Sequence, residues 1–137
     1  MKNKIIELCR FFVAGVTLLA LFMLAGCVQT VTLVVYNNSG KDVCVTALSE
    51  KYDLKSQTAI RILAAAKSKH SLQVTDSAGN SYTASFTTPH NGNLHQNIYL
   101  QLEKDMKIYR VGNDKFPQRS LPPQSEGFPV VLSGGKK

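Results

Sequence analysis

The sequence predicts an all-β fold: a small antiparallel β-sandwich of about seven strands, immunoglobulin-like or transthyretin-like in plan. Two observations favour this class. Short runs rich in β-branched and aromatic residues alternate with turn-forming residues at spacings of roughly 8–15 residues. In addition, no stretch after residue 27 keeps the apolar period of 3.6 residues that a helical bundle requires.

The first two expected strands are residues 30–37 (TVTLVVYN) and residues 42–48 (DVCVTAL). Both are rich in residues that suit a pleated, half-buried surface. Residues 38–41 between them form a turn, in which Gly40 can take a positive φ. We therefore expect these strands to pair as a hairpin, and we expect the polar residues 49–58 that follow to be irregular.

Residues 58–69 allow two interpretations. The short apolar run at residues 60–63 suits a strand, whereas the three consecutive alanines at residues 64–66 favour one or two turns of helix. The sequence leaves both open.

A second hairpin is expected from residues 69–88. Residues 69–75 (KHSLQVT) alternate, which places Leu72 and Val74 on one face of a strand. A turn at residues 76–80 leads back into residues 81–88, where Tyr82 and Phe86 are available for packing.

A third hairpin is expected from residues 96–102 and 106–111, which flank the turn at residues 103–105. Ile98, Leu100 and Leu102 share one face of its first strand and are candidates for the core.

The sandwich domain is expected to span residues 30–112. Residues 113–137 contain four of the five prolines and show no alternation, so we expect a flexible tail or a segment laid along the domain. The apolar island at residues 130–132 suits an edge strand, either on this domain or on a partner's sheet.

The N-terminus has the three parts of a signal peptide. Lys2, Lys4 and Arg10 form a basic region, partly offset by Glu7, and residues 11–23 form an apolar run of 13 residues. That run is shorter than the roughly 20 residues that span a bilayer. If the apolar stretch is counted through Val28, about 18 residues, an uncut signal anchor is the alternative.

Leu24, Ala25, Gly26 and Cys27 follow the apolar run, and small residues, Ala25 and Gly26, stand just before the cysteine. This tetrapeptide resembles the lipobox of bacterial lipoproteins. The resemblance implies recognition of Leu24, Ala25 and Gly26 by a signal peptidase and removal of residues 1–26. It further implies acylation of Cys27, with residues 27–29 as a tether between the lipids and the domain.

The resemblance also implies a location in the cell envelope. Because Val28 rather than aspartate follows Cys27, the periplasmic face of the outer membrane is favoured over the inner membrane. Of 16 basic and 9 acidic residues, the leader removes three and one, which leaves 13 and 8 and a net charge of +5. This charge suits anionic lipids, lipopolysaccharide or peptidoglycan as neighbours; nucleic acid is not an expected partner.

Cys44 is the one thiol expected to stay free in the processed chain, because Cys9 leaves with the leader and Cys27 is acylated. Its position between Val43 and Val45 in a strand suggests burial as a small hydrophobe. An intermolecular disulfide or a reactive thiol is the alternative.

The sequence contains no recognisable catalytic motif, so we expect neither an enzyme nor a resident cofactor. His70, His90 and His95 are three imidazoles that could in principle hold a metal ion, but no closely spaced carboxylates or thiols accompany them. We expect loop histidines and no metal site.

Two further resemblances concern partners. Residues 78–82 (AGNSY) are similar to the Ser-Gly-x-x-Tyr loop of membrane-bound inhibitors of C-type lysozyme, with alanine in place of the leading serine and without that family's disulfide and tryptophan. Lys136 and Lys137 at the end of the chain resemble the C-terminus of the major outer-membrane lipoprotein, which is joined to peptidoglycan.

The expected function is therefore that of a lipid-anchored, non-enzymatic binding or structural module facing the periplasm. Inhibition of a cell-wall hydrolase is the alternative, and another envelope protein or peptidoglycan is the candidate partner.

Overall fold

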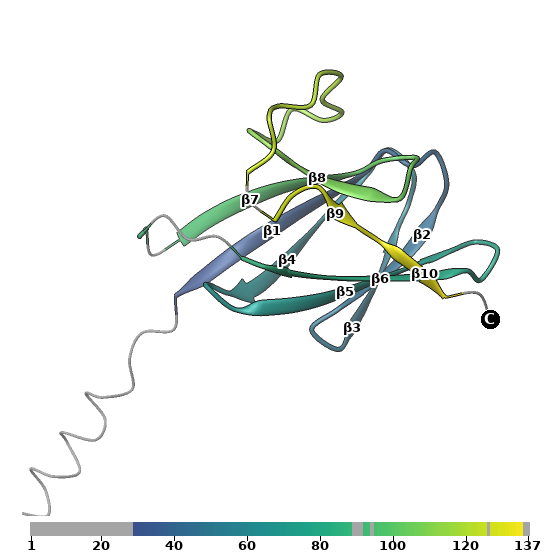
Figure 1. Cartoon of the computed structure of the whole chain (residues 1–137), viewed down its shortest axis with the longest axis horizontal. Coiled ribbons are helices and arrows are strands. Elements are labelled where there is room, and N and C mark those ends of the chain that lie inside the picture. Colours follow the sequence, from purple (N-terminus) through teal and green to yellow (C-terminus); the bar gives the residue numbers. More distant parts are fainter. Residues whose placement is uncertain (1–28, 89–91, 94, 126, 136–137) are drawn as a thin grey trace, which may run out of the picture.

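The computed structural model describes residues 29–88, 92–93, 95–125 and 127–135. Within these ranges the chain forms strands and no helix, as Figure 1 shows, and the predicted all-β sandwich is confirmed. The strands number ten rather than about seven: β1 (Thr30–Asn37), β2 (Val43–Ala47), β3 (Glu50–Leu54), β4 (Ala59–Ala65), β5 (Lys69–Asp76), β6 (Ser81–Thr87), β7 (His95–Leu102), β8 (Lys107–Val111), β9 (Val130–Val131) and β10 (Ser133–Gly135).

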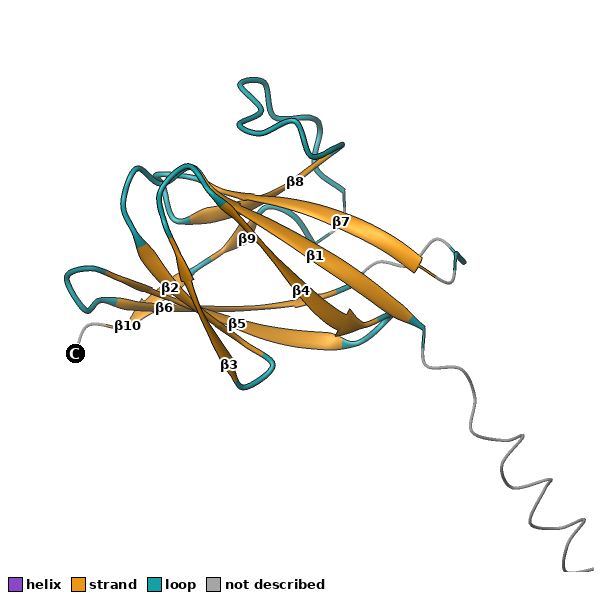
Figure 2. Ribbon diagram, turned by 180° about the vertical axis from the view of Figure 1, so that it is seen from behind, coloured by secondary structure: helices purple, strands orange, loops and turns teal. Residues whose placement is uncertain are grey.

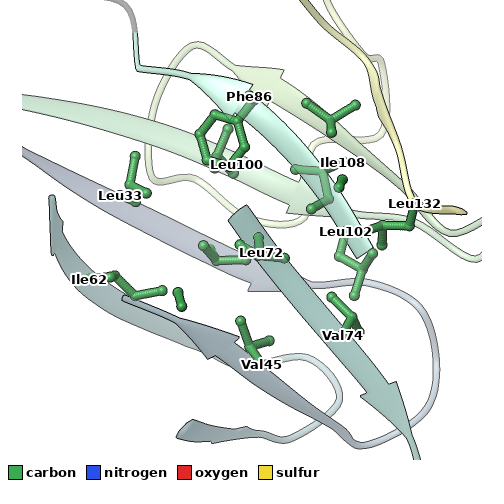
Figure 3. Packing of buried hydrophobic residues seen from close by; sticks show 14 of the residues in the cluster. Leu33, Val45, Ile62, Leu72, Val74, Phe86, Leu100, Leu102, Ile108 and Leu132 are labelled. Atoms are coloured by element: carbon green, nitrogen blue, oxygen red, sulfur yellow. The ribbon is translucent and has the colours of Figure 1, made fainter. Parts of the chain in front are cut away.

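The strands form two sheets of five, which pack face to face (Figure 2). Sheet A has the order β4-β1-β7-β8-β9, and sheet B has the order β10-β6-β5-β2-β3. Every strand pair is antiparallel except β1 and β7, which run parallel. The inward side chains of both sheets meet in one hydrophobic core, in which Leu72 and Val74 of sheet B face Leu100 and Leu102 of sheet A (Figure 3).

The expected hairpin of β1 and β2 is wrong, because β1 pairs with β4 and β7 while β2 lies in the opposite sheet. The physical reason is that β1 is apolar on both faces. Val35 faces the core, and Val34 and Tyr36 on the outer face are also buried. A strand that is buried on both faces needs a central place with neighbours on both sides.

The turn between β1 and β2 is organised by Asn37, whose side chain is fully buried. Its Nδ2 donates to the carbonyl oxygens of Lys41 (2.7 Å) and Leu54 (3.0 Å), and its Oδ1 accepts from the backbone N–H of Ser39 (3.0 Å). These bonds satisfy the amide and hold the connection that carries the chain from one sheet to the other.

Residues 50–54, which were expected to be irregular, form β3 and pair with β2 as a hairpin. The connecting residues Leu48 and Ser49 both have positive φ, 52° and 68°. Two successive residues of this kind make the tight turn that suits the twist of a hairpin, but the usual sequence for it is Asn-Gly or Asp-Gly. The turn therefore carries no recognisable signal in the sequence.

The two interpretations of residues 58–69 are resolved in favour of a strand, since residues 59–65 form β4. Ile62 and Ala64 point into the core and are buried, while Leu63 between them is 65% exposed. Pairing with β1 along the whole strand outweighs the helix propensity of the alanines.

The second and third hairpins are confirmed. β5 pairs with β6 and β7 pairs with β8, both antiparallel. The predicted inward residues are buried on the expected faces: Leu72, Val74, Phe86, Ile98, Leu100 and Leu102. Tyr82 is partly buried and packs against this core.

The C-terminal segment continues both sheets beyond Gly112. Val130–Val131 forms β9 on the edge of sheet A, next to β8, and Ser133–Gly135 forms β10 on the edge of sheet B, next to β6. Leu132 between them is buried in the core. The chain therefore passes from the β9 edge of sheet A to the β10 edge of sheet B (Figure 1). Of the alternatives for residues 130–132, the edge strand on this domain is the one observed.

Residues 112–125 and 127–129, here called the strap, lead from β8 to β9 across the outer face of sheet A. Phe116 stacks on Tyr36, with ring centroids 4.7 Å apart and planes inclined by 3°, and meets Tyr99 edge-on at 6.4 Å. Beside it, the fully buried Gln101 accepts from the backbone N–H of Gln118 (2.9 Å) and donates to its carbonyl (3.1 Å).

Farther along the strap, the side-chain amide of Gln124 takes the place of a strand partner for β8. Its Oε1 accepts from the backbone N–H of Arg110 (2.9 Å), and its Nε2 donates to the carbonyl of Arg110 (3.1 Å). The strap is thus hydrogen-bonded to sheet A at two positions and packed on it by one aromatic ring.

Candidate functional site

The expected lipidation site precedes the first strand in the sequence. Leu24, Ala25, Gly26 and Cys27 are outside the described residues, which begin at Gln29. The carbonyl of Gln29 accepts from the backbone N–H of Ala66 (2.9 Å), and β1 begins at the next residue. A chain acylated at Cys27 therefore has three residue steps, at most about 11 Å, between the lipid attachment and the first strand.

The N-terminal end of the sandwich is the end at which β1 and β7 begin and β4 ends. The connection from β4 to β5 lies here, and Thr88 ties it down: its hydroxyl donates to the carbonyl of Ala65 (2.9 Å), and its N–H donates to that of Ser68 (3.1 Å). Thr88 is 1% exposed, so these bonds are shielded from water.

The two described histidines, His70 and His95, have different surroundings. His70 in β5 points inward, and its Nε2 lies 2.9 Å from the carbonyl oxygen of Ala65, which gives this imidazole a structural hydrogen bond. His95 is exposed at the start of β7, and His90 lies outside the described residues. No group of three potential metal ligands occurs among the residues that the structure describes.

The expected burial of Cys44 is wrong. In β2 the side chains of Val43 and Val45 point into the core, so the thiol between them faces outward and is half-buried. Cys44 lies between Asp53 of β3 and Thr75 of β5 in the strand register. The period of two that buries both valines necessarily turns Cys44 to the outer face of sheet B.

Around Cys44 the outer face of sheet B is hollowed, with a volume of about 370 Å³, and three carboxylates from different strands and turns line it. Two of them already hold the fold. Asp42 accepts from the backbone N–H of Ser56 (2.8 Å), and Asp76 accepts from the backbone N–H of Asn80 (2.9 Å). The described lining of the hollow therefore brings three carboxylates, the ammonium of Lys55 and a thiol together, and no histidine base is among these residues.

Asp76, the last residue of β5, accepts three hydrogen bonds. The side-chain amide of Asn80 donates to it (3.0 Å), and the backbone N–H groups of Ala78 and Asn80 donate as well. These bonds, the side-chain bond first, lower the pKa of Asp76 below its usual 3.8 although partial desolvation opposes the shift.

The segment with the inhibitor-like pattern is the turn of the β5–β6 hairpin. Gly79 has a φ of 82°, which the turn requires and glycine adopts readily. Tyr82 at the start of β6 packs against the core instead of projecting from the turn, and a Cβ added at Gly134 in β10 would lie 3.1 Å from two carbons of its ring. Turn geometry and packing account for both the glycine and the tyrosine.

Buried polar side chains are hydrogen-bonded in the part of the chain that the structure describes. Each buried side-chain nitrogen or oxygen there has a hydrogen-bond partner. The same residues contain no helix long and apolar enough to cross a bilayer. Comparison of the sequence with protein-family models and with the curated proteins found no match.

Sequence reasoning did not anticipate the acidic surroundings of Cys44. The aspartates come from the turn after β1, from β3 and from the end of β5, which are distant in the sequence. The available signal was the alternation in β2: once Val43 and Val45 are assigned to the core, Cys44 must face outward with its cross-strand neighbours.

Proposed function

We propose that this chain is a lipid-anchored protein of the bacterial cell envelope that acts as a non-enzymatic binding or structural module facing the periplasm. The observation that carries the proposal is the tetrapeptide Leu24-Ala25-Gly26-Cys27, placed directly after an apolar run of signal-peptide length. Acyl chains on Cys27 insert into the membrane, and two or three of them hold a protein there stably, whereas one chain holds only marginally.

The position of the first strand supports this proposal. A lipobox cysteine must reach the membrane surface and the processing enzymes, and β1 starts only three residues later, at Thr30. The members of the core cluster in the described part of the chain lie between Val31 and Leu132, so removal of residues 1–26 takes away none of them. The periplasmic face of the outer membrane is the proposed location, because Val28 follows the cysteine.

The test is metabolic labelling with palmitate of the full chain and its Cys27→Ser variant. We expect label and a processed chain for the natural sequence, and an unlabelled precursor for the variant. Cys44→Ser is the matched control, because it removes the other thiol of the processed chain and must keep the label. Label that persists in Cys27→Ser contradicts the proposal.

The binding role rests on the sequence, which lacks catalytic motifs, and on the exposed edges of both sheets, which can accept a further strand. Crosslinking in native envelopes, followed by identification of the captured molecule, tests it. Capture of a single envelope protein or of peptidoglycan fragments supports a module of this kind. A soluble substrate turned over by the purified protein contradicts it.

Inhibition of a cell-wall hydrolase is the alternative function, based on residues 78–82. A lysozyme assay with the processed chain separates the two proposals. Unchanged hydrolysis at micromolar protein removes the alternative, while inhibition that is lost on substitution of Tyr82 by alanine and kept in Tyr52→Ala establishes it.

A further inference from the structure

The turn between β2 and β3 carries a leucine in a place that favours other residues. Leu48 and Ser49 have φ values of 52° and 68°, in the left-handed region that Gly, Asn and Asp adopt most readily. Leu48 is also 47% exposed. A leucine in this turn is therefore unfavourable twice, in its backbone conformation and in its contact with water.

The other large apolar side chains that are exposed in the described part of the chain, Leu63 and Val131, have a simple explanation. Each lies in a strand between two buried residues, so the alternation of the chain turns it outward. Leu48 lies in a turn, where no alternation imposes its exposure. A side chain held in a sparsely populated backbone conformation points to a function at that position.

The β2–β3 turn adjoins the connection from β4 to β5 at the N-terminal end of the sandwich. The covered part of Leu48 lines a small space in this region of the core, together with Ala64 of β4 and His70 of β5. The connection joins these two strands, and its residue Lys67 lies between Ala64 and His70 in the sequence. In Figures 1 and 2 the β2–β3 turn and the start of β1 both lie on the lower side of the domain, and the loop of the strap lies on the upper side.

The β4–β5 connection contributes a positive charge. Lys67 is exposed and belongs to no ion pair within the described part of the chain. The carboxylate nearest to the leucine in sequence, that of Glu50, accepts a hydrogen bond from the hydroxyl of Tyr52 (2.5 Å). Residues that adjoin β1, β6 and β7 in the sequence but lie outside the described ranges include no Asp or Glu: 27–28, 89–91 and 94.

The proposed anchor determines from which side the bilayer approaches the domain. The hydrogen bond from the N–H of Ala66 to the carbonyl of Gln29 (2.9 Å) ties the β4–β5 connection to the start of the described chain. An acylated Cys27 lies at most about 11 Å from Thr30, so the lipid surface is within reach of this connection and of the turn beside it. Apolar side chains that enter the boundary between headgroups and acyl chains, with basic side chains at the headgroups, are typical of proteins that lie on a membrane surface.

We infer that the β2–β3 turn seats the anchored domain on the bilayer, with Leu48 inserted among the lipids and Lys67 at anionic headgroups. The inference rests on the proposed lipid anchor, which brings this end of the sandwich to the membrane. It gives the domain a defined orientation, in which the loop of the strap faces away from the bilayer.

The experiment uses an introduced tryptophan, because the sequence contains none and a single one reports its own surroundings. The processed chain, residues 27–137 with Cys44→Ser, is coupled through Cys27 to a maleimide lipid in vesicles of phosphatidylcholine and phosphatidylglycerol. This coupling makes the outcome independent of acylation in the cell. Tryptophan emission is then compared between vesicles with and without bromine on the acyl chains, which quenches only a tryptophan that reaches them.

Leu48→Trp places the reporter in the turn. Val131→Trp is the matched control, because it also replaces an exposed apolar residue but lies opposite Lys107, at the far end of sheet A. We expect brominated chains to quench the emission of Leu48→Trp and to leave that of Val131→Trp unchanged.

The contribution of the charge is measured by adding a second substitution to Leu48→Trp. Lys67→Gln should lower the ratio of inserted to free turn about fivefold, since a basic side chain near an anionic surface contributes an effect of this size. Lys104→Gln must leave the ratio unchanged, because it removes an exposed lysine from the turn at the opposite end. All of these substitutions replace exposed residues, so the variants should fold, and a dispersed amide spectrum verifies this.

Three results overturn the inference. One is equal emission of Leu48→Trp with and without brominated chains. A second is equal quenching of Leu48→Trp and Val131→Trp, which shows that the domain has no preferred orientation. The third is blue-shifted emission of Leu48→Trp without quenching by bromine, which means that the turn contacts protein instead of lipid. Any of these combined with palmitate on Cys27 leaves the anchor in place and removes only the seating of the turn.

Discussion

Leu132→Ala tests whether the C-terminal segment belongs to the core of this protein. Leu132 is 5% exposed and sits between β9 and β10, where the chain passes from sheet A to sheet B. The substitution removes three carbon atoms from the core, worth about 0.8 kcal/mol each, or about 2.5 kcal/mol in total. Measured costs for buried leucines are about 2–5 kcal/mol, and we expect the lower part of that range because an edge strand can relax.

The neighbouring residue provides the control. Val131 is 58% exposed, so Val131→Ala should change the free energy of unfolding by less than about 0.5 kcal/mol. Urea unfolding followed by circular dichroism measures both variants. With a urea dependence of about 1–3 kcal/mol per molar, the Leu132→Ala midpoint falls by about 0.8–2.5 M.

Equal and small effects of the two substitutions would refute the reasoning. They would mean that residues 130–135 contribute no buried surface in solution and that the sandwich is stable without β9 and β10. A large effect of Leu132→Ala with a small effect of Val131→Ala can arise only if the side chains are buried and exposed as described.

Three further predictions concern the strap, the first turn and the acidic hollow. Phe116→Ala should lower the free energy of unfolding by about 2 kcal/mol, because a partly buried aromatic ring and its stacking on Tyr36 are lost. Urea unfolding measures this change, and a decrease of less than about 0.5 kcal/mol contradicts the prediction. Asn37→Ala should lower the free energy of unfolding by about 2–3 kcal/mol in the same assay, since it leaves two carbonyl oxygens without their donor. An unchanged urea midpoint contradicts the proposed role of this side-chain amide. The folded-state pKa of Asp76 is below its unfolded value of 3.8, so this carboxylate stabilises the fold above that pH and the contribution is lost as the pH falls through the folded-state pKa. Asp76→Asn should therefore lower the Tm at pH 7 and have a diminishing effect below about pH 4; a Tm difference that does not depend on pH is incompatible with this linkage.

The parts of the fold that follow from the sequence are those encoded in consecutive residues. Residues 69–87 and 95–111 each contain two alternating strands and a short turn, and both hairpins form as predicted. Their registers depend on local alternation and on turn residues such as Gly79. Local patterns of this kind are visible in a single sequence.

The partners of β1 depend instead on distant residues. The segment has the composition of a strand, but no local signal states that it lies between β4 and β7, or that β7 runs parallel to it. The β2–β3 hairpin was missed for another reason: its turn consists of Leu48 and Ser49 in a conformation that these residues seldom adopt.

The candidate sites also differ in whether their residues are consecutive in the sequence or are brought together by the fold. The proposed lipidation site is a contiguous pattern that ends at Cys27, so it can be recognised without coordinates. The carboxylates that line the hollow around Cys44 come from distant parts of the chain, and only the topology brings them together. Cys44 is intermediate, because its outward orientation follows from the alternation of β2 but its acidic neighbours do not.

The pairing of β10 bears on how the protein can meet peptidoglycan. If residues 113–137 were a free tail, 25 residues would reach up to about 80 Å from the domain. In the structure Gly135 pairs with Ser81, so Lys137 follows the last paired residue by only two steps, at most about 7 Å. Ser81 is the residue at which β6 begins, at the end of sheet B opposite to the N-terminal end. β10 ends on the side of the domain away from the start of β1 (Figure 1). Attachment of the Lys137 side chain to peptidoglycan therefore requires either the cell wall close to that end of the sandwich or the release of β10 from β6.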